Sequence, residues 1–141
     1  MNEVIKLLEV RDTPLSLDEV FAAVADPAAG GVAVFVGTVR SQDGGRKVTA
    51  LGYSAHPSAI DELRTVAEEV AAAHPVRAIA AVHRVGDLVV GDLAVVVGVS
   101  CAHRGDAFTA CRALIDELKS RVPIWKHQVF DDGGDEWVGL P

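Results

Sequence analysis

The sequence has few of the features that identify secreted or membrane proteins. Its two cysteines, Cys101 and Cys111, form neither a disulfide framework nor a CxxC motif, so we expect buried, reduced thiols. It has no run of about 18 apolar residues, and residues 1–3 carry acid where a signal peptide would carry base. These absences predict a soluble, cytoplasmic protein without a membrane segment.

Positive charge is also scarce. The 141 residues include 13 Lys and Arg against 20 Asp and Glu, which gives a formal net charge of -7. Nucleic acids and anionic membranes are bound through a broad surplus of basic residues, so the composition argues against both as partners. Any phosphate that this chain recognises should therefore belong to a small molecule held in a pocket.

The sequence lacks the short motifs of several common chemistries. It has no P-loop or GxGxxG segment for nucleotides and no GxSxG segment for a serine nucleophile. Its five histidines form no HxH or HExxH spacing and do not combine with the cysteines at zinc-finger intervals. We therefore expect neither a bound metal nor a cofactor.

What is present predicts one α+β domain spanning residues 1–141. Half of the residues are hydrophobic, which is enough for one continuous core in a chain of this length. Apolar and β-branched runs predict strands at residues 4–10, 31–39, 48–55, 77–85, 93–100, 124–130 and 136–138. Helical spacing predicts three helices, which begin behind capping Ser16, behind capping Ser58 and at Asp106, and end by residues 25, 73 and 121. This order favours a mostly antiparallel sheet over strict βαβ alternation.

Turn residues suggest which neighbouring strands pair. We expect the strands at 31–39 and 48–55 to form a hairpin, with residues 41–46 between them as a mobile loop because they lack an apolar anchor. A last hairpin is expected around residues 132–134, where Asp-Gly-Gly favours a tight turn. Pro123 prevents the third helix from continuing.

Two basic clusters flank the third predicted helix. CAHR at residues 101–104 precedes it and KSRVPIWK at residues 119–126 closes it, which in an acidic chain indicates a specific anionic ligand. Arg104 and Lys119 lie roughly 22 Å apart along a helix that rises ~1.5 Å per residue. Either the two ends have unrelated roles, or two chains each bring one end into a shared pocket. We favour the second, which a two-fold dimer would provide.

Individual cations in these clusters have distinct interpretations. His103 and Arg104 follow a strand and open a helix, where backbone N–H groups and the helix dipole attract anions. Lys119 is either a surface lysine paired with Asp116 or one of a close pair with Lys126. Two close, partly desolvated ammonium groups lower each other's pKa, and a neutral lysine is a nucleophile or general base. We favour the close pair.

Other exposed positions receive simpler interpretations. Arg40 ends a strand before a flexible segment and is a candidate anion ligand. We expect Arg46 and Lys47 to be simply exposed. Trp125 is expected to be a core or interface anchor rather than a stacking platform for a ligand.

Four segments, in order, resemble the large, catalytic subunit of molybdopterin synthase. They are GTVR at residues 37–40, HRVGDL at 83–88 with GD at 91–92, AHR at 102–104, and KSRVPIWK at 119–126. The similarity runs from about residue 31 to residue 137, which is most of the chain. Any one segment is weak, but four in register with the right spacing are specific.

The resemblance implies an α/β hammerhead fold and a sulfurtransferase of molybdenum cofactor biosynthesis. In that family, a small ubiquitin-like carrier subunit holds sulfur as a thiocarboxylate on its Gly-Gly C-terminus, and its tail threads into the large subunit. Two sulfur atoms are delivered to cyclic pyranopterin monophosphate, which yields the dithiolene of molybdopterin. Two large subunits form a central homodimer within a heterotetramer, and each site borrows residues from the opposite large subunit.

The resemblance also implies residue roles in this sequence. Lys119 would stand beside the incoming thiocarboxylate and act in attack or proton transfer, with Lys126 as a second catalytic cation. His103 and Arg104 from the other chain, together with Arg40, would hold the phosphate and pterin. The implied substrate-binding set is Thr38, Val39, Arg40, His103, Arg104, Lys119, Lys126, His127 and Gln128.

Two rival functions remain open from the residues. A lysine Schiff-base enzyme would act on a phosphorylated carbonyl compound with Lys119 as its amine, and borohydride would trap substrate on that lysine. A dimeric anion-sensing module would use the basic clusters for binding alone. It would bind its ligand tightly without turnover, even in the presence of a sulfur-charged partner.

Overall fold

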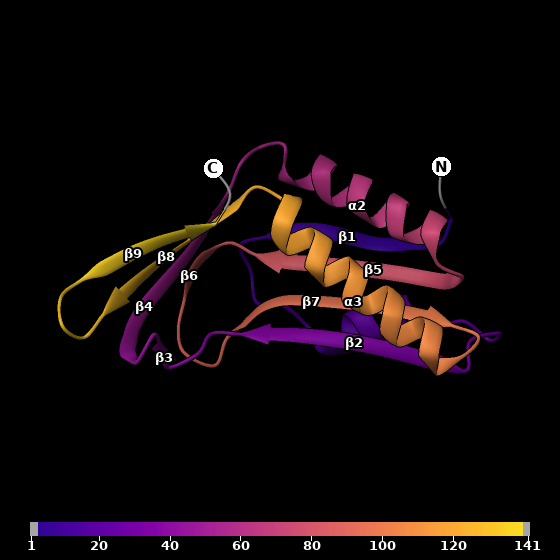
Figure 1. The fold of residues 1–141 in the computed structure, drawn as a ribbon, viewed down its shortest axis with the longest axis horizontal. Coiled ribbons are helices and arrows are strands. Elements are labelled where there is room, and N and C mark those ends of the chain that lie inside the picture. The colour runs from indigo at the N-terminus through magenta and orange to yellow at the C-terminus, as the bar shows by residue number, and fades with distance from the viewer. Residues whose placement is uncertain (1–2, 140–141) are drawn as a thin grey trace.

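Two β-sheets joined at one edge of the molecule organise the chain (Figure 1). The computed structural model describes residues 3–139; Met1, Asn2, Leu140 and Pro141 lie outside the described residues. The first sheet has the strand order β1 (Ile5–Arg11), β5 (Val76–Arg84), β7 (Leu93–Cys101) and β2 (Gly31–Thr38). The second has the order β3 (Gln42–Asp43), β4 (Arg46–Ala55), β8 (Ile124–Phe130) and β9 (Asp135–Gly139), and β6 (Gly86–Leu88) also pairs with β4.

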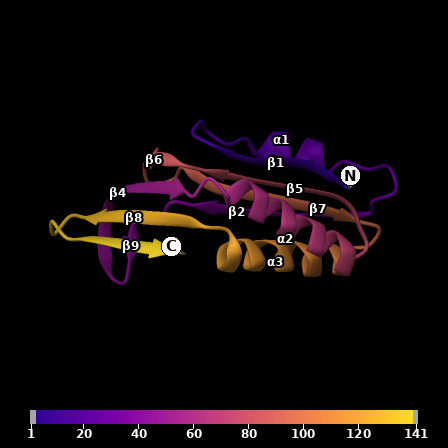
Figure 2. The ribbon, with the colours of Figure 1, turned by 90° about the horizontal axis from the view of Figure 1, so that it is seen from above.

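Helices cover both faces of the first sheet. Figure 2 shows α1 (Leu17–Ala23) on one face and α2 (Ala59–Ala73) with α3 (Arg104–Arg121) on the other. The central strands β5 and β7 are accordingly buried along nearly their whole length, and their sequences are almost continuously apolar. The larger core cluster lies under α2 and α3, and a smaller one lies under α1.

The predicted α+β class with three helices is confirmed for the described residues. Among the strand pairs of residues 3–139, β1 and β5 run parallel and the other pairs run antiparallel. The predicted cap of the first helix is also present, because the Glu19 backbone N–H donates to Ser16 Oγ at 3.2 Å. The predicted last hairpin forms between β8 and β9, with Gly133 at a φ of 88° in its turn.

The predicted hairpin between residues 31–39 and 48–55 is wrong. β2 pairs instead with β7, and β4 pairs with β8 in the other sheet. The reason is burial: β2 and β7 both pack under α3, whereas β4 is largely exposed or half-buried, with only Val48 and Leu51 buried, and fits a sheet with one open face. The sequence of a strand indicates which helices will cover it less clearly than it indicates where turns occur.

Other local predictions also need correction. Residues 41–46 contain the short strand β3, which pairs back on β4 through Gly44 and Gly45 at φ values of 58° and 79°, the backbone of a tight hairpin turn. Ser58 does not cap α2, since its hydroxyl lies 2.9 Å from His56 Nδ1. α3 begins at Arg104, two residues before the predicted Asp106.

Helix α3 runs the length of the first sheet and ends where the two sheets meet (Figure 1). Its buried face carries Ala107, Ala110, Cys111, Leu114 and Leu118, so both of its ends are fixed by the same core. No helix among residues 3–139 combines the length and the apolar character needed to cross a bilayer.

Candidate functional site

A pocket of about 150 Å³ lies at the C-terminal end of α3, at the junction of the two sheets. Val122 ends the helix and Pro123 turns the chain, so β8 begins at Ile124 and brings Lys126 back beside Lys119. Both lysines therefore line one pocket, as the sequence predicted. The lining residues are Tyr53, His83, Leu118, Lys119, Val122, Ile124, Lys126, Val138 and Gly139.

The environment of Lys119 favours its neutral form. The pKa of Lys119 is lowered, first because the surrounding protein desolvates its ammonium and second because the charge of Lys126 repels a proton. The side chain is exposed in the single chain, so this desolvation is partial. A lysine in this state can supply an unprotonated amine.

The alternative interpretation made Lys119 a surface lysine paired with Asp116; Lys119 is exposed in the single chain, but the pair with Asp116 does not form. The nearest cation to Asp116 is Arg112, whose Nε lies 3.5 Å from the carboxylate. Arg121 does pair with Glu117 at 3.3 Å, as expected for a solvated helix end, and reaches Glu69 at 2.8 Å. Within residues 3–139, Lys119 itself makes no ion pair.

Two pocket residues, His83 and Tyr53, were not predicted from the sequence. His83, at the end of β5, is 2% exposed, and burial lowers its pKa to about 4 despite a hydrogen bond with the Arg84 carbonyl. The Tyr53 ring meets the imidazole edge-on at 5.0 Å between centroids, and burial raises the pKa of its phenol. Both groups are uncharged at neutral pH. The HRVGDL segment was the sequence signal that pointed toward His83.

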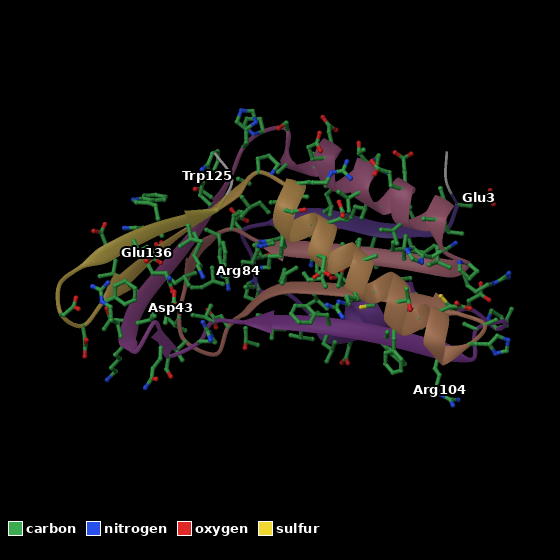
Figure 3. The ribbon with its side chains drawn as sticks, viewed as in Figure 1. Glu3, Asp43, Arg84, Arg104, Trp125 and Glu136 are labelled. Atoms are coloured by element: carbon green, nitrogen blue, oxygen red, sulfur yellow. The ribbon has the colours of Figure 1, made fainter. Side chains whose placement is uncertain are left out.

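The N-terminal end of α3 has the opposite character. His103 and Arg104 are exposed beside a wide, open depression of about 590 Å³, and in the described part of the chain neither forms an ion pair. Figure 3 shows Arg104 at one end of α3 and Trp125 just beyond the other end. This end is held against the sheet so tightly that a Cβ added to Gly31 would lie 2.8 Å from Arg104 Cα.

The remaining predicted substrate ligands lie on the second sheet or next to it. At the end of β2, Thr38 is exposed, Val39 is buried at 4% exposure in the core of the second sheet, and the Arg40 guanidinium lies 3.5 Å from Asp43. Gln128 is buried and donates to Asp43 at 2.6 Å and to Glu136 at 3.3 Å.

Asp43 links these predicted residues electrostatically. Its pKa is lowered first by the Gln128 hydrogen bond and then by the charges of Lys126 and Arg40, against a desolvation effect of opposite sign. Asp43 and Glu136 lie near each other in the second sheet (Figure 3). Arg40 and Lys126 are therefore coupled through one carboxylate that sequence reasoning did not identify.

His127 lies apart from the two lysines. Successive residues of a strand point to opposite faces, so Lys126 faces the lysine pocket while His127 lines a separate depression on the other side. There it bonds Asp135 at 2.8 Å and stacks on Trp137 at 4.4 Å between ring centroids. Its predicted substrate contact stays a prediction.

The structure corrects one of the simpler expectations and confirms another. Arg46 is not simply exposed: it holds Asp132 through two hydrogen bonds of 2.9 and 3.0 Å and lies over the Phe130 ring. Cys101 and Cys111 are free and buried, as predicted. Residues 3–139 contain no cluster of three or more His, Cys, Asp or Glu side chains that could hold a metal ion.

Known proteins resemble this chain over most of its length. The family model described as MoaE protein matches residues 10–121. Molybdopterin synthase catalytic subunit 1 of Mycobacterium tuberculosis is 47% identical over 132 residues, covering 91% of this chain and 87% of the relative. Molybdopterin synthase from Staphylococcus aureus matches with a TM-score of 0.87 and 34% identity, covering 94% of this chain and 96% of that one.

A more distant structure shares the fold. It comes from a protein–protein complex of subunits 1 and 2 of molybdopterin-converting factor from Helicobacter pylori. It matches with a TM-score of 0.67 and 22% identity, covering 96% of this chain and 89% of that one. The fold is therefore retained even where fewer than a quarter of the residues are identical.

Proposed function

This chain belongs to the MoaE family, whose members include the catalytic subunits of molybdopterin synthase, and from that identity we propose how its residues perform sulfur transfer. It acts in molybdenum cofactor biosynthesis as a sulfurtransferase. The proposed donor is the C-terminal thiocarboxylate of a small ubiquitin-like carrier subunit ending in Gly-Gly. The proposed acceptor is cyclic pyranopterin monophosphate, which receives two sulfur atoms and becomes the molybdopterin dithiolene.

The observation that carries the residue assignment is the lysine pair in one pocket. The thiocarboxylate and the phosphate-bearing substrate are both anions and repel each other. Preorganised cations offset that repulsion and stabilise the negative charge that develops in the transition state. Lys119, whose pKa is lowered, acts on the thiocarboxylate by attack or proton transfer, and Lys126 supplies a second cation on the facing strand.

The phosphate and pterin are proposed to be held by His103 and Arg104 of a second copy of this chain, together with Arg40. The two ends of α3 are roughly 22 Å apart at ~1.5 Å per residue, so one chain cannot present both to a small substrate. An apolar patch supports a homodimer, because β2 is an edge strand and Phe35 and Phe108 are 41% and 66% exposed beside α3.

The assembly and location follow from the same proposal. The homodimer would bind one carrier subunit at each lysine pocket and so form a heterotetramer. We propose that residues 1–141 act as one domain in the cytoplasm, where reducing conditions keep thiols such as those of Cys101 and Cys111 free.

The test is synthesis of molybdopterin from the purified chain, the cyclic pyranopterin and a thiocarboxylated carrier. We expect product with this carrier and none with the same carrier ending in an ordinary carboxylate. Borohydride trapping of substrate on Lys119 without any need for the carrier would favour a Schiff-base enzyme instead. Tight substrate binding without turnover, in the presence of the charged carrier, would identify an anion-sensing module.

A further inference from the structure

His83 is a buried polar side chain in the lysine pocket to which the proposed reaction gives no role. Its Nδ1 lies 2.7 Å from the Arg84 carbonyl oxygen, and because a carbonyl can only accept, Nδ1 carries the proton. In a neutral imidazole the other nitrogen, Nε2, then has a free lone pair. Nε2 makes no hydrogen bond with another residue of 3–139, and it is not one of the fully buried, unpartnered atoms of that range, so it faces the open space of the pocket.

The neutral state of His83 follows from its surroundings. Burial and, to a smaller extent, the charge of Lys119 together lower its pKa to about 4, so that ammonium is within electrostatic reach of the ring. On β1 and β7 the residues in register with His83 are Val10 and Val95, which do not titrate. The titratable groups that share the pocket with it are Tyr53, Lys119 and Lys126.

We propose that His83 is a positioning residue for Lys119: the two side chains line one pocket without a hydrogen bond between them in the free chain, and when the carrier tail enters the pocket Nε2 accepts a hydrogen bond from the lysine Nζ and fixes the direction of the amine. The inference rests on the proposed function of Lys119 and extends it to a second residue. Nδ1 is anchored to the Arg84 carbonyl, so the ring cannot turn away without losing a hydrogen bond. Tyr53 packs against the edge of the ring and holds its plane.

A neutral acceptor suits this pocket better than a charged one. A carboxylate in the same place would pair with Lys119, hold it as an ammonium and repel the anionic carrier tail. An imidazole offers one lone pair without adding negative charge, and with a pKa of about 4 it does not add a third positive charge at neutral pH. The amine is therefore oriented, and the hydrogen bond partly offsets the lowering of its pKa by burial and by Lys126.

Two amide variants separate the two ring nitrogens. His83→Asn keeps a donor near Nδ1 for the Arg84 carbonyl but has no acceptor near Nε2, whereas His83→Gln extends its amide to the position of Nε2. We expect His83→Asn to lower kcat about 10-fold with KM for the carrier unchanged, and His83→Gln to recover most of that loss. A packing role would make the shorter and longer amides equally harmful or equally harmless, and that result would overturn the proposal.

A second measurement does not depend on sulfur transfer. Lysines labelled by ¹³C reductive methylation are titrated by NMR in the complex with an unlabelled carrier that ends in an ordinary carboxylate, with Lys119 assigned by the signal missing in Lys119→Arg. A hydrogen bond accepted from an ammonium stabilises the charged form, so we expect the pKa of Lys119 to fall in His83→Asn and to return toward wild type in His83→Gln. An unchanged titration in both folded variants would contradict the proposal, even if molybdopterin synthesis itself is demonstrated.

Discussion

The two ends of α3 carry cations of the same kind in opposite settings. At the C-terminal end, Lys119 lines a small pocket with Lys126, Tyr53 and His83, and its pKa is lowered. At the N-terminal end, Arg104 is exposed beside an open depression about four times as large by volume (590 against 150 Å³). Lys119 and Arg104 are both exposed in the single chain, but the small pocket partly desolvates the Lys119 ammonium, whereas Arg104 lies beside a wide depression.

This difference suits the two ends of α3 to different roles. A reactive amine needs partial removal from water, which a single chain can build by turning at Pro123 and packing two sheets together. Recognition of an anionic substrate needs exposed cations that a second surface can cover, and the N-terminal end of α3 has these. The comparison therefore predicts that substitutions in the pocket lower the turnover rate, whereas substitutions at the N-terminal end of α3 weaken substrate binding.

The largest effect is expected from removing the reactive amine. Lys119→Ala should lower turnover at least about 100-fold while the fold persists, because the group at stake acts in the transition state and supports little of the core. Molybdopterin formation under saturating carrier measures the loss, and circular dichroism checks the fold. Lys47→Ala is the matched control, an exposed lysine on β4 outside the pocket. Turnover within about two-fold of wild type in Lys119→Ala would remove this lysine from the chemistry.

Mixing two inactive chains tests whether the two ends meet across a dimer. A His103→Ala/Arg104→Ala chain and a Lys119→Ala chain, exchanged at equal amounts, form mixed dimers with one intact site each. About a quarter of wild-type activity should return, since half of the dimers are mixed and each has one of two sites. Native mass spectrometry establishes the exchange. Fully mixed dimers that remain inactive would show that each site lies within one chain.

The pH dependence of turnover should shift when the neighbouring charge is removed. If neutral Lys119 is the active form, the rate rises with pH through its lowered pKa. Lys126→Gln removes the repelling charge, so the pKa of Lys119 moves up and the rising limb of the profile moves to higher pH. The kcat profile of this variant against wild type is the measurement. If the rising limb of the profile stays in place or moves to lower pH, the titration of Lys119 is not what produces that limb.

The smallest effect is expected midway along the same helix. Cys111→Ala should leave turnover unchanged, because the sulfur comes from the carrier and the thiol only fills the core. It should cost about 1 kcal/mol of unfolding free energy, as for other small core truncations. Urea unfolding and the synthesis assay measure both quantities. A loss of turnover without a loss of stability would give the thiol a chemical role.

The order and type of most elements were predictable because they depend on local periodicity. The nearly continuous apolar runs of β5 and β7 and the helical spacing of α2 and α3 can be read without knowing their neighbours. Strand pairing was not predictable in the same way. The choice of β7 over β4 as the partner of β2 depends on which helices cover each sheet, and adjacent residues do not encode that.

The candidate site was partly predictable for the same reason. Lys119 and Lys126 are seven residues apart across a proline turn, so their proximity is a local property. His83, Tyr53 and Asp43 come from three other strands, and only the folded chain brings them near the lysines. The separation of His127 from the lysine pocket could have been predicted, because successive residues of a strand face opposite sides and His127 follows Lys126 directly.

The contact between Gly31 and the start of α3 has a consequence for interpreting inactive variants. An alanine at this position would press its methyl group onto the Arg104 backbone, so the start of the helix or the strand would have to move. Such a chain would retain the proposed reactive side chains and yet misalign Arg104, the residue proposed to complete the site of a second copy. A genetic screen for loss of the cofactor should therefore recover substitutions at this glycine among its strongest hits, far from any group that exchanges atoms with substrate.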